Sequence, residues 1–166
     1  MATVTFHDKA VTTYGDLPKD GANAPNFKLI ATDLSSRSLH DYQGQNVIIN
    51  IFPSVDTGVC AQSVRTFNEK AAQLDNTKVL CVSKDLPFAF ARFCAAEGLD
   101  NVESLSDFRD GNFGKSYGVT FVDGPLEGLH SRAVVVLNED AEVIYTEQVD
   151  EITNEPDYEA ALNSLS

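Results

Sequence analysis

A cysteine at the start of a predicted helix is the residue of this sequence best placed for chemistry. The apolar run 47–52 predicts a buried strand, and the apolar residues from Val59 onward recur at helical spacing. Cys60 therefore lies where the loop after the strand becomes the first helical turn. Unpaired backbone N–H groups and the helix dipole favour negative charge at that place, and the thiolate is the reactive form of cysteine. The sequence thus predicts that Cys60 is a nucleophile.

Two other residues of the same loop are expected to support the sulfur. Thr57 stands three positions before Cys60 and can place a hydroxyl beside it. Pro53 can stiffen the exit from the strand and screen the thiol from water. We therefore include both residues in the candidate site.

The surrounding residues favour a peroxide as the target of the thiolate. Acyl transfer would need a histidine base, and of His7, His40 and His130 only His130 is a plausible partner. Thiol–disulfide exchange of the thioredoxin kind would need a second cysteine at position 63, which is Ser63. A peroxide has a weak O–O bond, so the reaction mainly requires fixed donors that stabilise charge on the leaving oxygen.

Arg132 is the candidate for a charged donor in this reaction. It directly precedes the apolar segment 133–137, which predicts a strand. The backbone N–H groups of Val59 and Cys60 and the hydroxyl of Thr57 could supply further donors. The alternative interpretation of Arg132 is a surface arginine at the end of a strand.

A second thiol is needed after the peroxide has been reduced, because the attack leaves Cys60 as a sulfenic acid. Cys94 lies near the end of a predicted helix, among small residues and before Gly98, so this segment could loosen. Cys81 lies within the apolar segment 79–83, where a thiol usually behaves as a small hydrophobic group. Because a disulfide requires Cα atoms within roughly 7 Å, we expect local unwinding around Cys60, Cys94 or both during turnover.

The predicted fold class is α/β: the strands form a mixed sheet, and helices cover both of its faces. Ligands of such sheets bind beyond the carboxyl ends of the strands, which is where Cys60 lies. The predicted elements are a hairpin within 1–15, strands at 27–31, 47–52, 79–83 and 102–104, a helix from 59 that ends at 75–76, a second helix after 85, a hairpin of 133–137 with 143–148, and a helix at 156–165.

The boundaries of the second helix are marked by three residues. Asp85 can cap its first turn, and Pro87 can occupy that turn, where a missing N–H is harmless. Gly98 is expected to end it.

Composition restricts the classes of function. The 166 residues fit one domain, 1–166, with a proper core. With 12 basic and 25 acidic side chains the net charge is -13, which argues against nucleic acid and anionic membranes as partners. No apolar run reaches the length of about 18 residues of a membrane span, and the N-terminus does not resemble a signal peptide, so we expect a cytoplasmic protein. Three cysteines and three distant histidines suggest neither a disulfide scaffold nor a metal site, and no cofactor is expected.

Taken together, these motifs resemble the bacterial thiol peroxidases, the Tpx-type branch of the atypical two-cysteine peroxiredoxins. The likeness extends over almost the whole chain, and the order of its segments makes it strongly specific. The matching segments are 52–60 with its Pro-x-x-x-Thr-x-x-Cys pattern, 85–89, 92–94 with Arg-Phe-Cys, 123–129, 132–136, 149–152 and 155–162.

The resemblance implies more than the residues alone. It implies a thioredoxin-like fold with an added N-terminal β-hairpin. It also implies antioxidant reduction of hydrogen peroxide and organic hydroperoxides to water and alcohols. Cys60 would be the peroxidatic cysteine and Cys94 the resolving cysteine, joined in an intramolecular disulfide that thioredoxin reduces. Arg132 would be an active-site residue, and the protein a homodimer.

Two other functions remain open at this point. A redox-sensing binding protein could use the same disulfide as a switch and turn over little, and only catalytic cycling separates it from a peroxidase. A thioredoxin-like exchange enzyme is disfavoured because the chain lacks a C-x-x-C motif.

Overall fold

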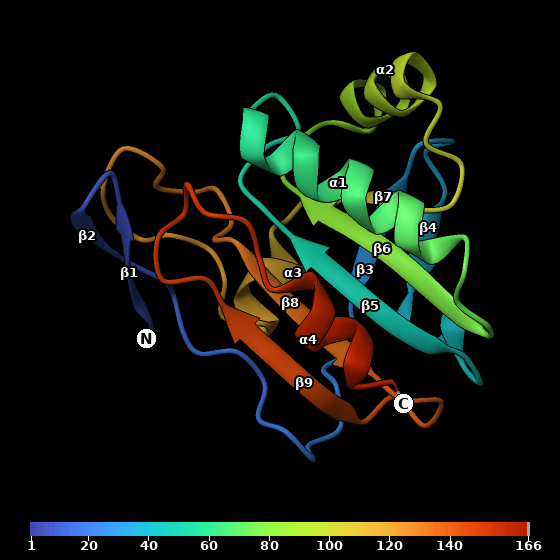
Figure 1. The fold of residues 1–166 in the computed structure, drawn as a ribbon. Coiled ribbons are helices and arrows are strands. Elements are labelled where there is room, and N and C mark those ends of the chain that lie inside the picture. The colour runs from blue at the N-terminus through green and yellow to red at the C-terminus, as the bar shows by residue number, and fades with distance from the viewer. Residues whose placement is uncertain (166) are drawn as a thin grey trace.

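A mixed sheet forms the centre of the molecule in a computed structural model that describes residues 1–165 (Figure 1). Within those residues its seven strands follow the order β4-β3-β7-β6-β5-β8-β9. β5 and β6 are parallel, as are β6 and β7, whereas β3 and β8 run antiparallel to their neighbours. The strands are β3 (Lys28–Ala31), β4 (Ser36–Ser38), β5 (Asn46–Ile51), β6 (Thr77–Ser83), β7 (Glu103–Ser106), β8 (Ala133–Leu137) and β9 (Val143–Gln148).

Helices cover both faces of this sheet, as the sequence predicts. The helices within residues 1–165 are α1 (Gly58–Ala71), α2 (Pro87–Glu97), α3 (Asn112–Ser116), α4 (Tyr158–Asn163) and a 3-10 helix, η1 (Leu39–Tyr42). α1 and α4 lie on one face of the sheet and α3 lies behind it (Figure 1). Ile48 of β5 packs with residues of α1 and α4, whereas the next residue, Ile49, packs with residues of α3. None of the helices in the described chain is long and apolar enough to cross a membrane.

A separate hairpin precedes the sheet and confirms the prediction for the N-terminus. It consists of β1 (Thr3–Phe6) and β2 (Lys9–Thr12). His7 and Asp8 join the strands with φ of 51° and 67°, the left-handed geometry that two-residue hairpin turns require. The Glu151 carboxylate accepts a hydrogen bond from Asp8 N at 3.0 Å, which ties the hairpin to the loop after β9.

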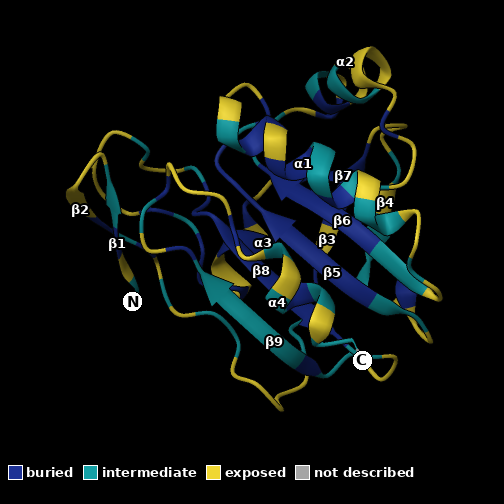
Figure 2. Cartoon of the chain, in the orientation of Figure 1, coloured by how far each residue is buried: buried dark blue, intermediate teal, exposed yellow. Residues whose placement is uncertain are grey.

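The three cysteines share one apolar cluster, to which α1, α2 and β6 contribute. Cys60 and Cys81 are fully buried within it, and Cys94 is partly buried against it. The strands beneath this cluster are buried along most of their length, whereas the outer face of α2 is exposed (Figure 2). The other buried members are Phe52, Val55, Val64, Phe90 and Leu99.

The sequence does not predict the shortest elements. β4 is three polar residues and η1 is a single turn, so neither shows apolar periodicity. α3 has five residues and follows Gly111, whose φ of 68° is left-handed. α1 also ends at Ala71, before the predicted end at 75–76.

The predicted cap of α2 is wrong. The helix begins at Pro87, and its N-cap position is occupied by Leu86, whose side chain cannot accept a hydrogen bond. The Asp85 carboxylate is instead engaged by the loop that follows β5. The other boundary predictions are confirmed, because Pro87 lies in the first turn and Gly98 ends the helix with φ 67°.

Candidate active site

Cys60 lies in the first turn of α1, as the sequence predicts. Thr57 is the N-cap residue, with extended backbone angles. The first helical hydrogen bond runs from Ala61 N to Thr57 O at 2.9 Å, so the N–H groups of residues 58–60 precede the helical ladder. These groups give the sulfur an electropositive surrounding, which favours the thiolate.

Arg132 is buried beside this sulfur. Its Nη2 donates to Cys60 Sγ at 3.2 Å, and its Nε donates to Ile152 O at 2.7 Å. Only 2% of the residue is exposed, so the interpretation as a surface arginine is wrong. Nη1 is buried too and has no hydrogen-bond partner among residues 1–165. A fixed cation with one nitrogen unpartnered among the described residues therefore stands at the sulfur.

A cavity of about 320 Å³ opens beside this arginine. Pro53, Thr57 and Arg132 all line it, so the structure brings these predicted site residues together. The remaining walls are mainly apolar and come from the N-terminal hairpin, the start of α1 and three loops: Phe6, His7, Ser54, Gly58, Val59, Leu126, Leu129, Ile152 and Thr153. The pocket can accept an apolar molecule whose reactive end meets the guanidinium.

Thr57 contacts its own loop in this state. Its hydroxyl donates to Ser54 O at 3.0 Å, which leaves the oxygen atom free to accept a hydrogen bond. The residue is exposed at the mouth of the pocket. Its place is therefore compatible with a role toward a bound molecule.

A larger hollow of about 390 Å³ lies at the opposite end of β5, where His40 and Tyr42 are part of its wall. No cysteine lines it, and within residues 1–165 no group of three His, Cys, Asp or Glu side chains could hold a metal ion. The smaller cavity, by contrast, is lined by Arg132, which contacts the sulfur of Cys60.

Cys94 and Cys81 differ in their surroundings, although all three cysteines are free thiols. Cys94 Sγ lies 3.4 Å from Ser104 Oγ at the partly buried side of α2. Cys81 is fully buried in β6, which is paired with β5 on one side and β7 on the other. Burial raises the pKa of the Cys81 thiol to about 12, and burial also raises the pKa of Cys94.

These differences predict the order of alkylation by iodoacetamide. In a Cys60→Ser chain, where no disulfide exchange competes, we expect Cys94 to react well before Cys81. Because folding raises the pKa of Cys94, the folded α2 loses stability relative to the unwound segment once the pH exceeds the ordinary thiol pKa. The labelling of Cys94 should therefore accelerate with rising pH, as measured by mass spectrometry over time. If Cys81 were labelled before Cys94 in the folded Cys60→Ser protein, the predicted order of alkylation would be wrong.

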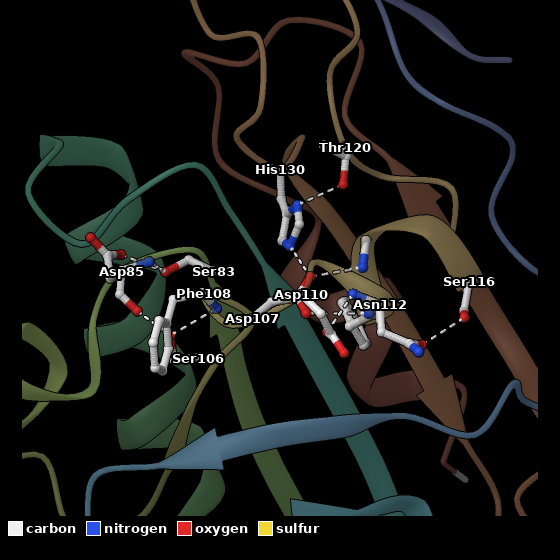
Figure 3. A network of polar contacts seen from close by, with 12 residues as sticks. Ser83, Asp85, Ser106, Asp107, Phe108, Asp110, Asn112, Ser116, Thr120 and His130 are labelled. Carbon is white, nitrogen blue, oxygen red and sulfur yellow. Dashed lines mark hydrogen bonds and ion pairs between the residues drawn. The ribbon is translucent and has the colours of Figure 1, made fainter. Parts of the chain in front are cut away.

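A buried network around Asp107 was not predicted (Figure 3). Its carboxylate accepts hydrogen bonds from His130 Nε2 at 2.9 Å and from Gly114 N at 2.9 Å. His130 Nδ1 lies 3.2 Å from Thr120 Oγ1, so both ring nitrogens are engaged and His130 is not available as a base for Cys60. The network anchors the loop that leads to Arg132. No local pattern could reveal it, because Asp107 and His130 are 23 positions apart.

Comparison with known proteins finds relatives over the full chain. The family model for Redoxin matches residues 19–162. The thiol peroxidase of Corynebacterium glutamicum is 52% identical over 166 residues, 100% of both chains. The thiol peroxidase of Mycobacterium tuberculosis is 56% identical over 165 residues, 99% of both chains. The crystal structure of a peroxiredoxin-like protein from Aquifex aeolicus superposes with a TM-score of 0.93 at 36% identity, over 98% of this chain and 95% of that one. This structural likeness confirms the predicted thioredoxin-like fold.

Proposed function

The chain belongs to the Redoxin family as a thiol peroxidase, an enzyme that reduces peroxides with thiols, and we propose that Cys60 is the sulfur that attacks the peroxide. The observation that carries this proposal is the contact of 3.2 Å between Arg132 Nη2 and Cys60 Sγ, made by a guanidinium whose Nη1 remains without a partner in the described chain. A cation beside a cysteine favours the thiolate, which is the nucleophilic form.

The first chemical step converts the thiol and a hydroperoxide into a sulfenic acid and an alcohol, or water. The sulfur of Cys60 bonds to one peroxide oxygen, the O–O bond breaks, and the leaving oxygen takes up a proton. Arg132 Nη1 and the N–H groups at the start of α1 are donors for the charge that develops on this oxygen. Thr57 and Pro53 line the cavity at the same place, so we assign them to positioning the peroxide and excluding water.

Cys94 is the resolving cysteine in this proposal. Its thiol attacks the sulfenic sulfur of Cys60, which forms a disulfide and releases water. Cys94 packs against the cluster that contains Cys60, and it lies on a helix at the surface. Cys81 is held between two neighbouring strands and cannot move toward Cys60 without opening the sheet. Both α1 and α2 are intact while the thiols are free, and we propose that local unwinding brings the two sulfur atoms together.

Reduction of this disulfide by thioredoxin completes the proposed cycle. Thioredoxin is the reductant that the resemblance implies, and the partly exposed Cys94 offers a sulfur for exchange. We further propose that residues 1–166 act as one domain, that two copies form a homodimer, and that the enzyme works in the cytoplasm. The exposed apolar side chains Leu86 and Phe88 support an association of this kind, which light scattering after gel filtration would test.

Organic hydroperoxides are proposed as substrates besides hydrogen peroxide, because the cavity walls are mainly apolar. We expect Leu129→Ser to lower kcat/KM for cumene hydroperoxide by about fivefold, since one leucine contact contributes about 1 kcal/mol to holding an apolar group. The value for hydrogen peroxide should stay within about twofold, because this substrate has no apolar part. Leu34→Ser is the matched control, as Leu34 is exposed and outside the cavity. Equal losses for both peroxides would contradict the role of the cavity.

A coupled assay tests the function as a whole. Peroxide should drive continuous oxidation of NADPH through thioredoxin reductase and thioredoxin, and mass mapping after one equivalent of peroxide should find a disulfide between Cys60 and Cys94. A chain that is oxidised once and is not recycled would instead be a redox sensor.

A further inference from the structure

The Asp85 carboxylate connects the segments that carry the two reactive cysteines. Asp85 stands two residues before α2, which bears Cys94, and its side chain reaches the loop that leads to Cys60. On the premise of the roles proposed above for the two cysteines, we propose that Asp85 is a positioning residue, a latch that holds this loop on the sheet and controls when the loop unwinds to let the two cysteines meet.

Ser54 connects the loop to the Asp85 carboxylate. Ser54 Oγ donates to Asp85 Oδ1 at 2.7 Å, and Val55 N donates to Asp85 Oδ2 at 2.9 Å. Ser54 O in turn accepts from Thr57 N at 3.2 Å and from Thr57 Oγ1 at 3.0 Å. Because Thr57 is the N-cap of α1, the carboxylate fixes the turn that places Cys60.

The other side of the latch is anchored in the sheet. Asp85 is held by Ser83 of β6 through two hydrogen bonds. Asp85 N donates to Ser83 Oγ at 3.0 Å, and Ser83 Oγ donates to Asp85 Oδ2 at 2.5 Å. Asp85 O accepts a hydrogen bond from Ser106 Oγ, so β6 and β7 both hold this residue (Figure 3). The loop before α1 is therefore attached to the rigid sheet at the point where α2 begins.

Other links between these segments are more exposed. Arg65 of α1 pairs with Glu97 of α2, and their side chains are 41% and 32% exposed. Arg92 of α2 pairs with Asp56 of the loop at 3.4 Å, but both side chains are about two-thirds exposed and such pairs contribute little. The bonds of Asp85 are partly buried and involve a charged acceptor, which makes them stronger than neutral hydrogen bonds. Among the described residues, Asp85 thus supplies the strongest polar contacts between this loop and the sheet.

The latch has a chemical consequence after the first step. The sulfenic acid of Cys60 can react with the Cys94 thiol to give a disulfide and water. It can instead react with a second hydroperoxide, which transfers one oxygen to give a sulfinic acid and leaves as the alcohol. The first route needs the loop before Cys60 to leave Asp85 and unwind, so that the two sulfur atoms can meet. The second route needs the assembled site. A tight latch therefore favours fast peroxide reduction and also favours over-oxidation.

Two substitutions weaken the latch without touching either cysteine. Asp85→Asn removes the charge and one acceptor oxygen, and Ser54→Ala removes the loop hydroxyl while every backbone anchor of Asp85 stays. For each we expect the rate of Cys60 oxidation to fall by about tenfold, as loss of a hydrogen bond to a charged group implies. The ratio of sulfinic acid to disulfide, measured by mass spectrometry across a peroxide series, should fall by a similar factor of about ten.

The matched control is Asp157→Asn, because Asp157 caps α4 and accepts a hydrogen bond from Ala160 N at 3.0 Å. In this variant, the rate of Cys60 oxidation and the ratio of sulfinic acid to disulfide should equal those of the unchanged protein. An unchanged or higher ratio of sulfinic acid to disulfide in Ser54→Ala and Asp85→Asn would overturn the latch, even if oxidation slows. Ser54→Ala alone decides the question if Asp85→Asn does not fold. Absence of a disulfide between Cys60 and Cys94 in the unchanged protein would instead refute the proposed function.

Discussion

Replacing Arg132 with methionine should slow the oxidation of Cys60 by peroxide by about two to three orders of magnitude, the usual effect of losing one preorganised donor at a reacting oxygen. The substitution removes the contact of Nη2 with the sulfur and also removes the buried Nη1 that has no partner within residues 1–165. The sulfur then loses its neighbouring cation, and the leaving oxygen loses a charged donor. Rapid mixing of the reduced protein with hydrogen peroxide measures this rate directly.

Two comparisons separate this effect from damage to the fold. Arg132→Lys retains a positive charge but not the planar pair of donors, so we expect an intermediate rate. Arg132→Met also loses the hydrogen bond of Nε to Ile152 O, and near-ultraviolet circular dichroism should establish that the variant keeps its tertiary structure. A folded Arg132→Met protein that reacts within about threefold of the normal rate would show that the guanidinium is not part of the chemistry.

Replacing Cys94 with serine should stop turnover after a single reaction. The peroxide step remains fast because Arg132 and the start of α1 are unchanged, so the first equivalent of peroxide is consumed in a rapid burst. No thiol then attacks the sulfenic acid, and the steady-state rate with thioredoxin falls to the uncatalysed level. The burst of peroxide consumption and the absence of further NADPH oxidation measure the two halves of this prediction.

Cys81→Ser provides the matched comparison, since it removes a thiol from the same cluster. We expect nearly normal turnover, because Cys81 is fully buried between two paired strands. The assignment of the resolving cysteine would be wrong if Cys81→Ser blocked turnover and Cys94→Ser did not.

The position of Cys60 could be predicted because local signals determine it. A continuous apolar run, a short loop and a helical pattern follow one another within the segment 47–74, and the structure has β5 and α1 there. The two strands of the last hairpin, 133–137 and 143–148, were predicted with their observed limits for the same reason. Short-range periodicity thus accounts for the main elements of the sheet.

The contacts of the site could not be predicted, because they join distant parts of the chain. Arg132 lies 72 positions after Cys60, and nothing near it in sequence distinguishes a buried guanidinium from a surface one. Asp85 shows the same limitation, since the local capping rule assigns it to α2, whereas Ser54, 31 positions away, binds its side chain. Tertiary contacts that outweigh a local preference are visible only in the folded structure.

The buried, unpartnered nitrogen of Arg132 has a consequence for how this protein can be improved or altered. A buried donor without an acceptor among the described residues costs about 1–3 kcal/mol. Within the protein, Arg132 thus keeps a donor for a bound peroxide instead of a further internal hydrogen bond. Selection for heat resistance alone would favour a side chain with more internal contacts at this position, at the expense of catalytic activity.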